Sequence, residues 1–176
     1  ALRMAVDYDK SRTVLQAIDT ALAGKALRQN ILLDLALVCK ALKDNEAAVV
    51  AAEELVQLNP KSNLALQAQA LLAGVNADGL DREAKLSAIE AKALKQGAFV
   101  VKHNLALDRV KVTTDISECM AILESVSASA KRSGDHYNGM RATLKLAKLV
   151  LDSGGKLSRE QMNSAIDSYH YLYSDS

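Results

Sequence analysis

Apolar and polar residues alternate along most of this chain with the spacing of an α-helix. In the stretch 7–23 the apolar side chains recur at steps of three and four, which places them on one helix face: Val14, Leu15, Ile18 and Leu22. The stretch 31–42 is apolar on more than one face, which is typical of a helix packed between neighbours. Only Val110 to Thr113 has a short strand-like composition, and we interpret it as a helix end.

Turn and capping residues divide this pattern into nine predicted helices. Pro60 disfavours helix at the residue before it. Ser62, Asp115 and Ser158 stand at N-cap positions, and the last two have capping-box spacing with Glu118 and Gln161. We expect helices at about 7–23, 27–42, 46–58, 63–75, 82–96, 98–110, 116–131, 137–151 and 159–173. Their short loops predict antiparallel neighbours, so the fold class is all-α.

The helical pattern repeats along the chain. The first helix of the hairpin 30–60 has counterparts 34 residues later, where Leu66, Gln69, Ala70 and Ala73 match Leu32, Leu35, Ala36 and Cys39. Its second helix has counterparts 36 residues later, where Ala84, Ala88 and Ala91 match Ala48, Ala52 and Leu55. We expect the buried side of the helix 82–96 to hold Ala84, Ala88, Ala91 and Leu94. A period near 34 residues with one small insertion predicts stacked helix pairs.

On these residues the chain resembles the tetratricopeptide repeat family, over about 29–62 and more faintly over 63–97. Pro60 closes the unit, Ala48 and Ala52 are small, and Leu35 is followed by small Ala36. The places where the family carries aromatic residues hold Leu32, Cys39 and Ala52, which departs from its pattern. The resemblance implies a right-handed α-solenoid with a concave, partner-binding surface. We expect repeats over 1–97 and further hairpins over 98–176 that continue or cap the array in a single domain.

Composition adds limits to this interpretation. The chain has 176 residues, of which 49% are hydrophobic and only 3% aromatic, so small side chains must do much of the packing. The net charge of +1 argues against a general nucleic-acid binder. Basic residues nevertheless predominate over 82–111 and 131–148, which leaves nucleic-acid contact along these faces as one alternative.

The two cysteines, Cys39 and Cys119, both fall within apolar helical patterns. We interpret them as buried free thiols of a cytoplasmic protein. No apolar run reaches the roughly 18 residues that a membrane-spanning helix needs. The chain opens at Ala1 without an initiator methionine, and on the repeat register its first helix would be the second member of a pair. We therefore expect part of a longer protein.

No residue pattern indicates catalysis. None of the three histidines, His103, His136 and His170, has a second His or Cys at metal-ligand spacing, so we expect surface or hydrogen-bonded side chains. The segment Gly154-Gly155-Lys156 lacks the spacing and the Ser or Thr of a phosphate-binding loop. We therefore expect no enzyme activity, no metal and no cofactor.

The residues that remain as candidates for partner binding are polar or aromatic side chains on three predicted helices. The family's carboxylate-binding positions hold Leu33 and Leu37 in the first repeat, which excludes that clamp. Two later helices carry polar groups at comparable places, and the last helix concentrates tyrosines at an end suited to capping or docking. The candidates are Lys102, His103, Asn104, Asp108, Tyr137, Asn138, Arg141, Lys145, Tyr169 and Tyr173.

These observations predict a non-enzymatic interaction module, a scaffold or sensor, that binds a protein or peptide. The alternative from another class is a self-association module whose exposed apolar end, the Tyr169 to Tyr173 face, joins copies of the chain. Nucleic-acid contact through the basic faces is a further alternative.

Overall fold

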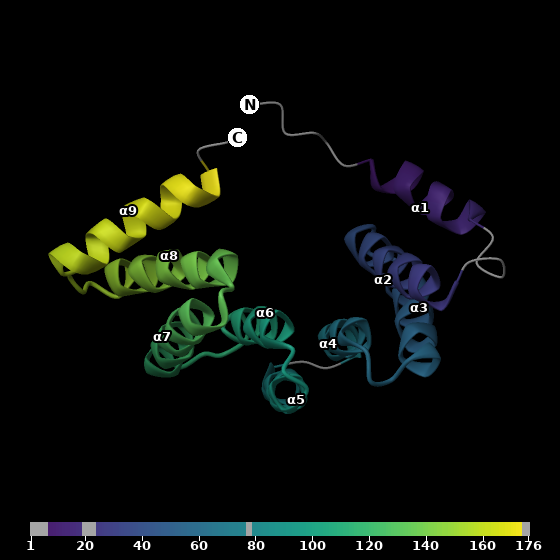
Figure 1. The fold of residues 1–176 in the computed structure, drawn as a ribbon, viewed down its shortest axis with the longest axis horizontal. Coiled ribbons are helices and arrows are strands. Elements are labelled where there is room, and N and C mark those ends of the chain that lie inside the picture. Colours follow the sequence, from purple (N-terminus) through teal and green to yellow (C-terminus); the bar gives the residue numbers. More distant parts are fainter. Residues whose placement is uncertain (1–6, 19–23, 77–78, 174–176) are drawn as a thin grey trace. The chain divides into compact units, whose positions relative to one another are not determined.

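The computed structural model describes residues 7–18, 24–76 and 79–173, and in these ranges all regular structure is helical (Figure 1). The helices run in the order α1 (Tyr8–Ala17), α2 (Lys25–Ala41), α3 (Asn45–Leu58), α4 (Asn63–Asn76), α5 (Gly79–Lys95), α6 (Phe99–Arg109), α7 (Ile116–Ser133), α8 (His136–Asp152) and α9 (Arg159–Tyr173). The all-α prediction is confirmed for this part of the chain. From α2 onward the ends differ from the predicted ones by at most three residues.

The first predicted helix is the exception. α1 ends at Ala17, and Ile18 has extended backbone angles, φ −70° and ψ 122°. Residues 19–23 of the predicted helix lie outside the described residues. No residue of α1 is buried, so its apolar positions lack the core packing that holds most helices of this length in place.

The chain divides into two compact units, with the boundary between residues 78 and 79. The sequence-based division at residue 97 rests on repeat resemblance and stays a prediction. In the first unit each helix packs on the next, from α1 to α4, and α2 also packs on α4. The core contains several small side chains with no exposed surface, namely Ala36, Cys39, Ala48, Ala52 and Ala68, packed with leucines such as Leu55. Small side chains let α2 and α3 approach closely, as the scarcity of aromatic residues predicts.

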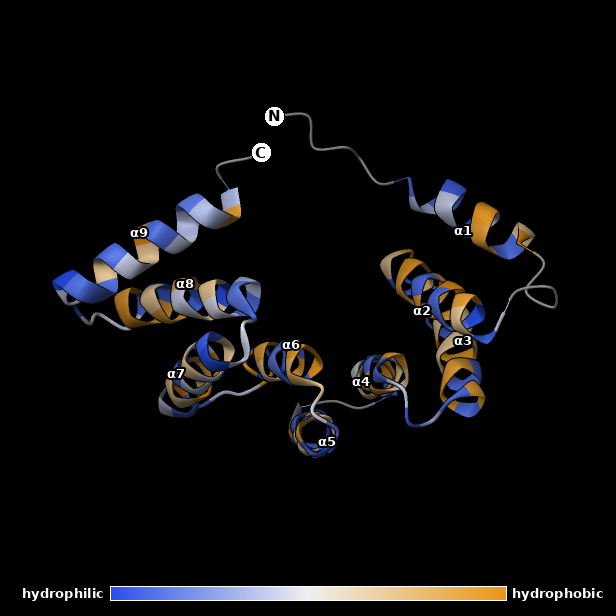
Figure 2. Ribbon diagram, viewed as in Figure 1, coloured by the Kyte–Doolittle hydropathy of each residue, from blue (hydrophilic) through white to orange (hydrophobic). Residues whose placement is uncertain are grey.

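In the second unit successive helices also pack in order, from α5 to α9, and α6 contacts α8. Its core joins α6, α7 and α8 through Ala106, Leu107, Ile122, Leu123, Val126 and Ala142. Orange apolar segments run through these helices in Figure 2, whereas α9 is mostly blue to white. This difference agrees with the single buried residue of α9, Ser168.

N-cap side chains fix where several helices begin. Asp44, Ser62, Asp115 and Asp135 each accept a hydrogen bond from a backbone N–H of the first helical turn, at 2.8–3.3 Å. Ser158 and Gln161 form the predicted reciprocal capping box. The box predicted at Asp115 is one-sided, because the carboxylate of Glu118 lies 3.6 Å from Arg109 instead.

The predicted buried face of α5 is wrong. Ala84, Ala88 and Ala91 are exposed, and Leu94 is 50% exposed. The buried residues are Leu86, Ile89 and Ala93. Burying two large aliphatic side chains removes more apolar surface from water than burying three alanines, so the helix turns that face inward. The 36-residue correspondence between α3 and α5 therefore does not describe equivalent buried positions.

A different correspondence links α3 and α7. The four buried residues of α3 are Ala48, Ala51, Ala52 and Leu55. Each has a buried counterpart in α7 that lies 71 residues later: Cys119, Ile122, Leu123 and Val126. The N-cap residues Asp44 and Asp115 have the same separation. The two units therefore share one helix pattern at about twice the predicted 34-residue period.

Candidate functional site

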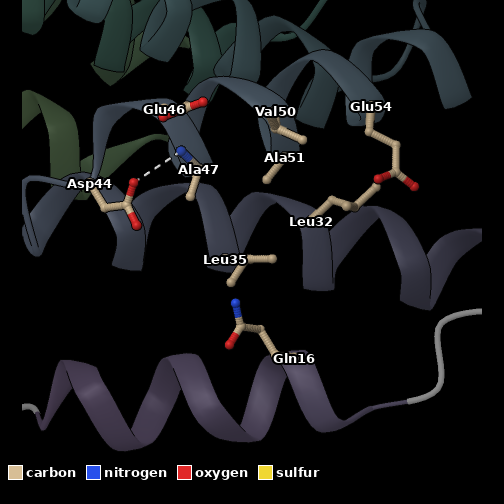
Figure 3. A pocket seen from close by; sticks show the side chains of 9 residues that line it. All are labelled: Gln16, Leu32, Leu35, Asp44, Glu46, Ala47, Val50, Ala51 and Glu54. Carbon is tan, nitrogen blue, oxygen red and sulfur yellow. Dashed lines mark hydrogen bonds between the residues drawn. The ribbon is translucent and has the colours of Figure 1, made fainter.

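A pocket of about 420 Å³ lies between α1, α2 and α3 in the first unit (Figure 3). Leu32 and Leu35 of α2 face Val50 and Ala51 of α3 across it, and Gln16 of α1 points in from the third side.

Two of the three carboxylates that line this pocket form ion pairs within the unit. Asp44 Oδ2 lies 2.9 Å from Arg12 Nη1, and Glu54 pairs with Arg28. Asp44 also caps α3, which is the dashed contact to Ala47 N in Figure 3. Because the wall from α1 contains no buried residue and two of the carboxylates are paired, this pocket presents few fixed polar groups to a ligand.

The second unit contains a buried polar cluster where α6 meets α7 and α8. His103 has no exposed surface, and its Nδ1 lies 2.8 Å from Asp135 Oδ2. Its Nε2 lies 2.9 Å from the hydroxyl of Ser129. Asn138 is 1% exposed and donates from Nδ2 to the same carboxylate oxygen at 2.9 Å. Buried polar groups must find partners, and here they satisfy one another, so this cluster holds three helices together.

Arg141 connects the buried cluster to the surface. Its Nη1 donates to the Oδ1 atoms of Asn138 at 3.0 Å and of Asn104 at 3.2 Å. Its guanidinium carbon lies 5.4 Å from the centroid of the Tyr137 ring, which is a cation–π distance. Contacts with α6 on one side and with its own helix on the other fix the position of this positive charge.

Further cations continue from Arg141 along α8 and the end of α6. We define the α6–α8 surface as Asn104, Asp108, Lys111, Tyr137, Arg141, Lys145 and Lys148. Steps of three and four residues place Asn104 and Asp108 on one row of α6 and Arg141, Lys145 and Lys148 on one row of α8, and Lys111 follows in the turn after α6. The Asn104–Arg141 hydrogen bond joins the two rows. Four of the seven residues are cations, against the single carboxylate of Asp108, which lies 2.5 Å from Lys111 Nζ.

The surroundings of Lys145 disfavour its protonated, charged form. Burial lowers the pKa of Lys145, and the neighbouring charges of Lys111, Arg141 and, to a smaller extent, Lys148 lower it further, against the opposing effect of Asp108. Like charges placed close together disfavour the protonated form of a lysine. An anion bound on the α6–α8 surface would relieve this repulsion.

A pocket of about 300 Å³ opens beside Lys145, among α7, α8 and the turn between α6 and α7. We call it the lysine pocket. Its apolar wall consists of Val110, Ile116, Leu123 and Leu149, and the charged residues that line it are Lys145, Lys148 and Asp152. Lys145 and Lys148 belong to both the pocket and the α6–α8 surface, which makes the two features continuous.

The structure brings together half of the ten residues that the sequence indicated. Asn104, Asp108, Tyr137, Arg141 and Lys145 gather on the α6–α8 surface. His103 and Asn138 are instead buried beneath it, where their hydrogen bonds are internal. Of the two states expected for the histidines, a surface position or a hydrogen-bonded one, His103 has the second, and its burial removes it from the candidates for partner contact. Lys102, one residue before His103, is partly exposed.

Tyr169 and Tyr173 lie apart from this group, on α9. Their rings contact each other at 5.1 Å, and they are 57% and 54% exposed. They therefore do not cap α8. The buried Ser168 and the partly buried Ala165 and Leu172 mark the side of α9 that packs on α8.

Sequence reasoning missed the residues that organise the site. Neither Asp135 nor Ser129 is among the predicted site residues, although both hold His103. The signal for Asp135 was its N-cap position three residues before Asn138. Lys111 and Lys148 were considered only as members of the basic faces.

Several cations of these basic faces have acidic neighbours. Lys85 lies 2.7 Å from Asp81, and Arg109 lies 3.5 Å from Glu90. The pairing leaves fewer unmatched positive charges along 82–111 than the sequence suggests, which weakens the case for a nucleic-acid surface there.

Among residues 7–18, 24–76 and 79–173, none of the helices is both long and apolar enough to cross a membrane. Within the same residues, no group of three or more His, Cys, Asp or Glu side chains is arranged to hold a metal ion. Comparison of the chain with protein-family models, curated proteins and solved structures gives no match.

Proposed function

We propose that this chain is a non-enzymatic interaction module that binds another protein through the α6–α8 surface. The observation that carries the proposal is the crowding of Lys111, Arg141 and Lys145 beside the open lysine pocket. Such crowding costs folding free energy, and the buried cluster beneath it already joins the helices without these charges. An arrangement that costs stability and gains from a bound anion is typical of a binding surface.

The helix arrangement supports a repeat-like scaffold for this surface. α2 packs on α4 and α6 packs on α8, so alternate helices contact each other within each unit. The common pattern of α3 and α7 adds a second sign of repetition. We propose a tetratricopeptide-like stack in which α6 and α8 are first helices of successive pairs, the helices that line the concave surface in that family.

The two cysteines support a reducing, cytoplasmic location. Cys39 and Cys119 are both free and buried, as expected of thiols in a compartment that does not form disulfides.

Site-specific photo-crosslinking tests the proposed surface. A benzophenone amino acid is placed at Tyr137 on the α6–α8 surface or at Tyr171 on α9, two positions that are each 58% exposed. We expect crosslinks to another protein from Tyr137, in the cells that produce the chain, and none of the same mass from Tyr171. Identical adducts at both positions, or none at Tyr137, would contradict the proposal.

Self-association is the second candidate, and the outer face of α9 favours it. Met162, Ile166, Tyr169 and Tyr173 follow one another at steps of four, three and four residues, and each is about half exposed. A second copy of this chain would bury that row. We expect light scattering to show a concentration-dependent dimer that is lost in Ile166→Asp. A monomer at every concentration would eliminate this candidate.

A further inference from the structure

The lysine pocket combines an open apolar wall with two lysines in its lining. Ile116 is 51% exposed even though it lies against the pocket, whereas Leu123 in the same wall is 1% exposed. A volume of about 300 Å³ is near the lower limit of ligand pockets in proteins. It suits one bulky side chain rather than an extended molecule.

The charged residues near the pocket indicate which charge a ligand should carry next to that side chain. Lys145 and Lys148 line the pocket, and Lys111 and Arg141 lie close enough to Lys145 to lower its pKa. Asp108 is paired with Lys111, and Asp152 lies in the pocket lining itself. Further carboxylates lie near the pocket wall, since Glu83 accepts a hydrogen bond from Thr113 and the charges of Glu118 and Asp115 act on Cys119. On the α6–α8 surface itself four cations accompany the single carboxylate of Asp108, so a ligand that crosses this surface is favoured when it is negatively charged.

We propose that the partner segment is acidic and contains a bulky apolar residue, which enters the lysine pocket while neighbouring Asp or Glu side chains contact Lys145 and Lys148. This inference rests on the proposed function and adds the chemistry of the partner to it. The apolar anchor contributes contact area inside the pocket, and the charge pairs at the edge select the sequence around it.

Nucleic acid fits the same cations less well. Recognition of single strands commonly uses aromatic side chains on which bases stack, and the pocket wall is aliphatic. The nearby aromatic ring, Tyr137, is engaged with Arg141. A phosphate backbone would use the lysines but would leave the apolar wall uncovered.

The test is selection of peptides from a random displayed library on the purified chain. We expect enriched sequences with one Leu, Ile, Met or Phe flanked by Asp or Glu. Two variants then separate the two parts of the site. Thr114→Trp fills the pocket from an exposed position in the turn before α7, and Lys148→Glu reverses an exposed charge.

Each variant has a matched control in the second unit. Ser125→Trp adds the same ring at an exposed position of α7, and Lys156→Glu makes the same charge change at an exposed position of the α8–α9 loop. We expect roughly a 5- to 10-fold weaker affinity for the selected peptide in Thr114→Trp and Lys148→Glu. The controls should match the original chain, and circular dichroism should show equal helix content in all five proteins.

Three results would overturn the inference. The first is a set of enriched peptides without the acidic and apolar pattern, and the second is pocket variants that bind the selected peptide as well as their controls do. The third is binding of a labelled single-stranded oligonucleotide with an affinity that Thr114→Trp leaves unchanged. The proposed function fails separately, when crosslinking at Tyr137 yields no protein. If Tyr137 crosslinks to a partner but Thr114→Trp does not weaken peptide binding, the proposed function of the α6–α8 surface stands and the inferred role of the lysine pocket is wrong.

Discussion

The imidazole Nδ1 of His103 lies 2.8 Å from the carboxylate Oδ2 of Asp135, and this contact ties the interior of α6 to the first turn of α8. The two side chains are 0% and 7% exposed. An ionised carboxylate only accepts hydrogen bonds, so Nδ1 must carry a proton. The same carboxylate caps α8 through Asn138 N. One buried acid therefore sets both the start of a helix and its position against a neighbour.

Replacing Asp135 should reveal how much this contact contributes. Burial alone would raise the pKa of Asp135, but hydrogen bonds from Asn138 and His103 outweigh it and lower the pKa below 3.8. A lowered carboxyl pKa adds stability that is present above the unfolded-state value and is lost as pH falls through the folded-state value. We expect Asp135→Asn to lower the free energy of unfolding at neutral pH by about 1–3 kcal/mol. It should also reduce the loss of stability below about pH 4, as urea unfolding at a series of pH values will show.

Asp115→Asn is the matched control. Asp115 caps α7 in the same way but is exposed. Asparagine caps helices about as well as aspartate, so we expect a change of only a few tenths of a kcal/mol. Equal effects at the two positions would mean that the His103 contact contributes nothing beyond the cap.

Lys145 should show opposite effects on stability and on binding. Burial and then the charges of Lys111 and Arg141 lower its pKa below 10.5. The folded state therefore disfavours the charge at neutral pH, and this cost fades as pH rises from the lowered value towards the ordinary one. We expect Lys145→Met to raise the free energy of unfolding slightly, because solvent screens much of the repulsion at this partly exposed lysine, and to weaken binding of a selected acidic peptide.

Lys148→Met tests whether this trade-off is specific. Lys148 is exposed, and its charge is a smaller contributor to the lowered pKa of Lys145, so its removal should weaken peptide binding and stabilise the fold less than Lys145→Met does. Chemical unfolding and peptide titration of both variants provide the comparison. A loss of stability in Lys145→Met would show that the lysine is a structural residue.

The buried face of α5 differs from the predicted one, and two leucines of this helix test the difference. Leu86 is 1% exposed and Leu94 is 50% exposed. We expect Leu86→Ala to cost about 2–5 kcal/mol, through lost burial and a residual cavity. Leu94→Ala should cost about 0.5 kcal/mol or less. If thermal or chemical unfolding showed a larger loss of stability for Leu94→Ala than for Leu86→Ala, the face predicted from the alanines would be the buried one.

The two cysteines should resist alkylation in the folded protein. Cys39 has no exposed surface and Cys119 is 6% exposed. Burial raises the pKa of both thiols, and the Glu118 and Asp115 carboxylates raise that of Cys119 further. Because the thiolate is the reactive form, we expect iodoacetamide to label both far more slowly in buffer than in urea, as mass spectrometry will measure. Rapid labelling of Cys119 in buffer would show that the α6–α7 turn opens readily.

Helix positions were predictable because their signals are local. Pro60, Ser62 and Ser158 act on residues within one turn, so the sequence alone places the corresponding ends. The buried face of α5 was not predictable from repeat matching, since alanines at matched positions compete with Leu86 and Ile89 for the core. Periodicity shows that a helix has an apolar side, but the larger side chains decide which side is buried.

The candidate surface was predictable in part for a related reason. Asn104, Asp108, Arg141 and Lys145 share helical rows that the sequence displays. The partnership of His103 and Asp135 spans 32 residues, and only the packing of α6 against α8 reveals it. The lysine pocket likewise depends on three segments that meet only in the folded chain.

The most direct test of partner binding on the α6–α8 surface is amide hydrogen exchange with and without a peptide selected on the original chain. We predict slower exchange in residues 104–116 and 137–152, with little change in α2 to α4. Protection confined to the first unit or to α9 would contradict binding at this surface.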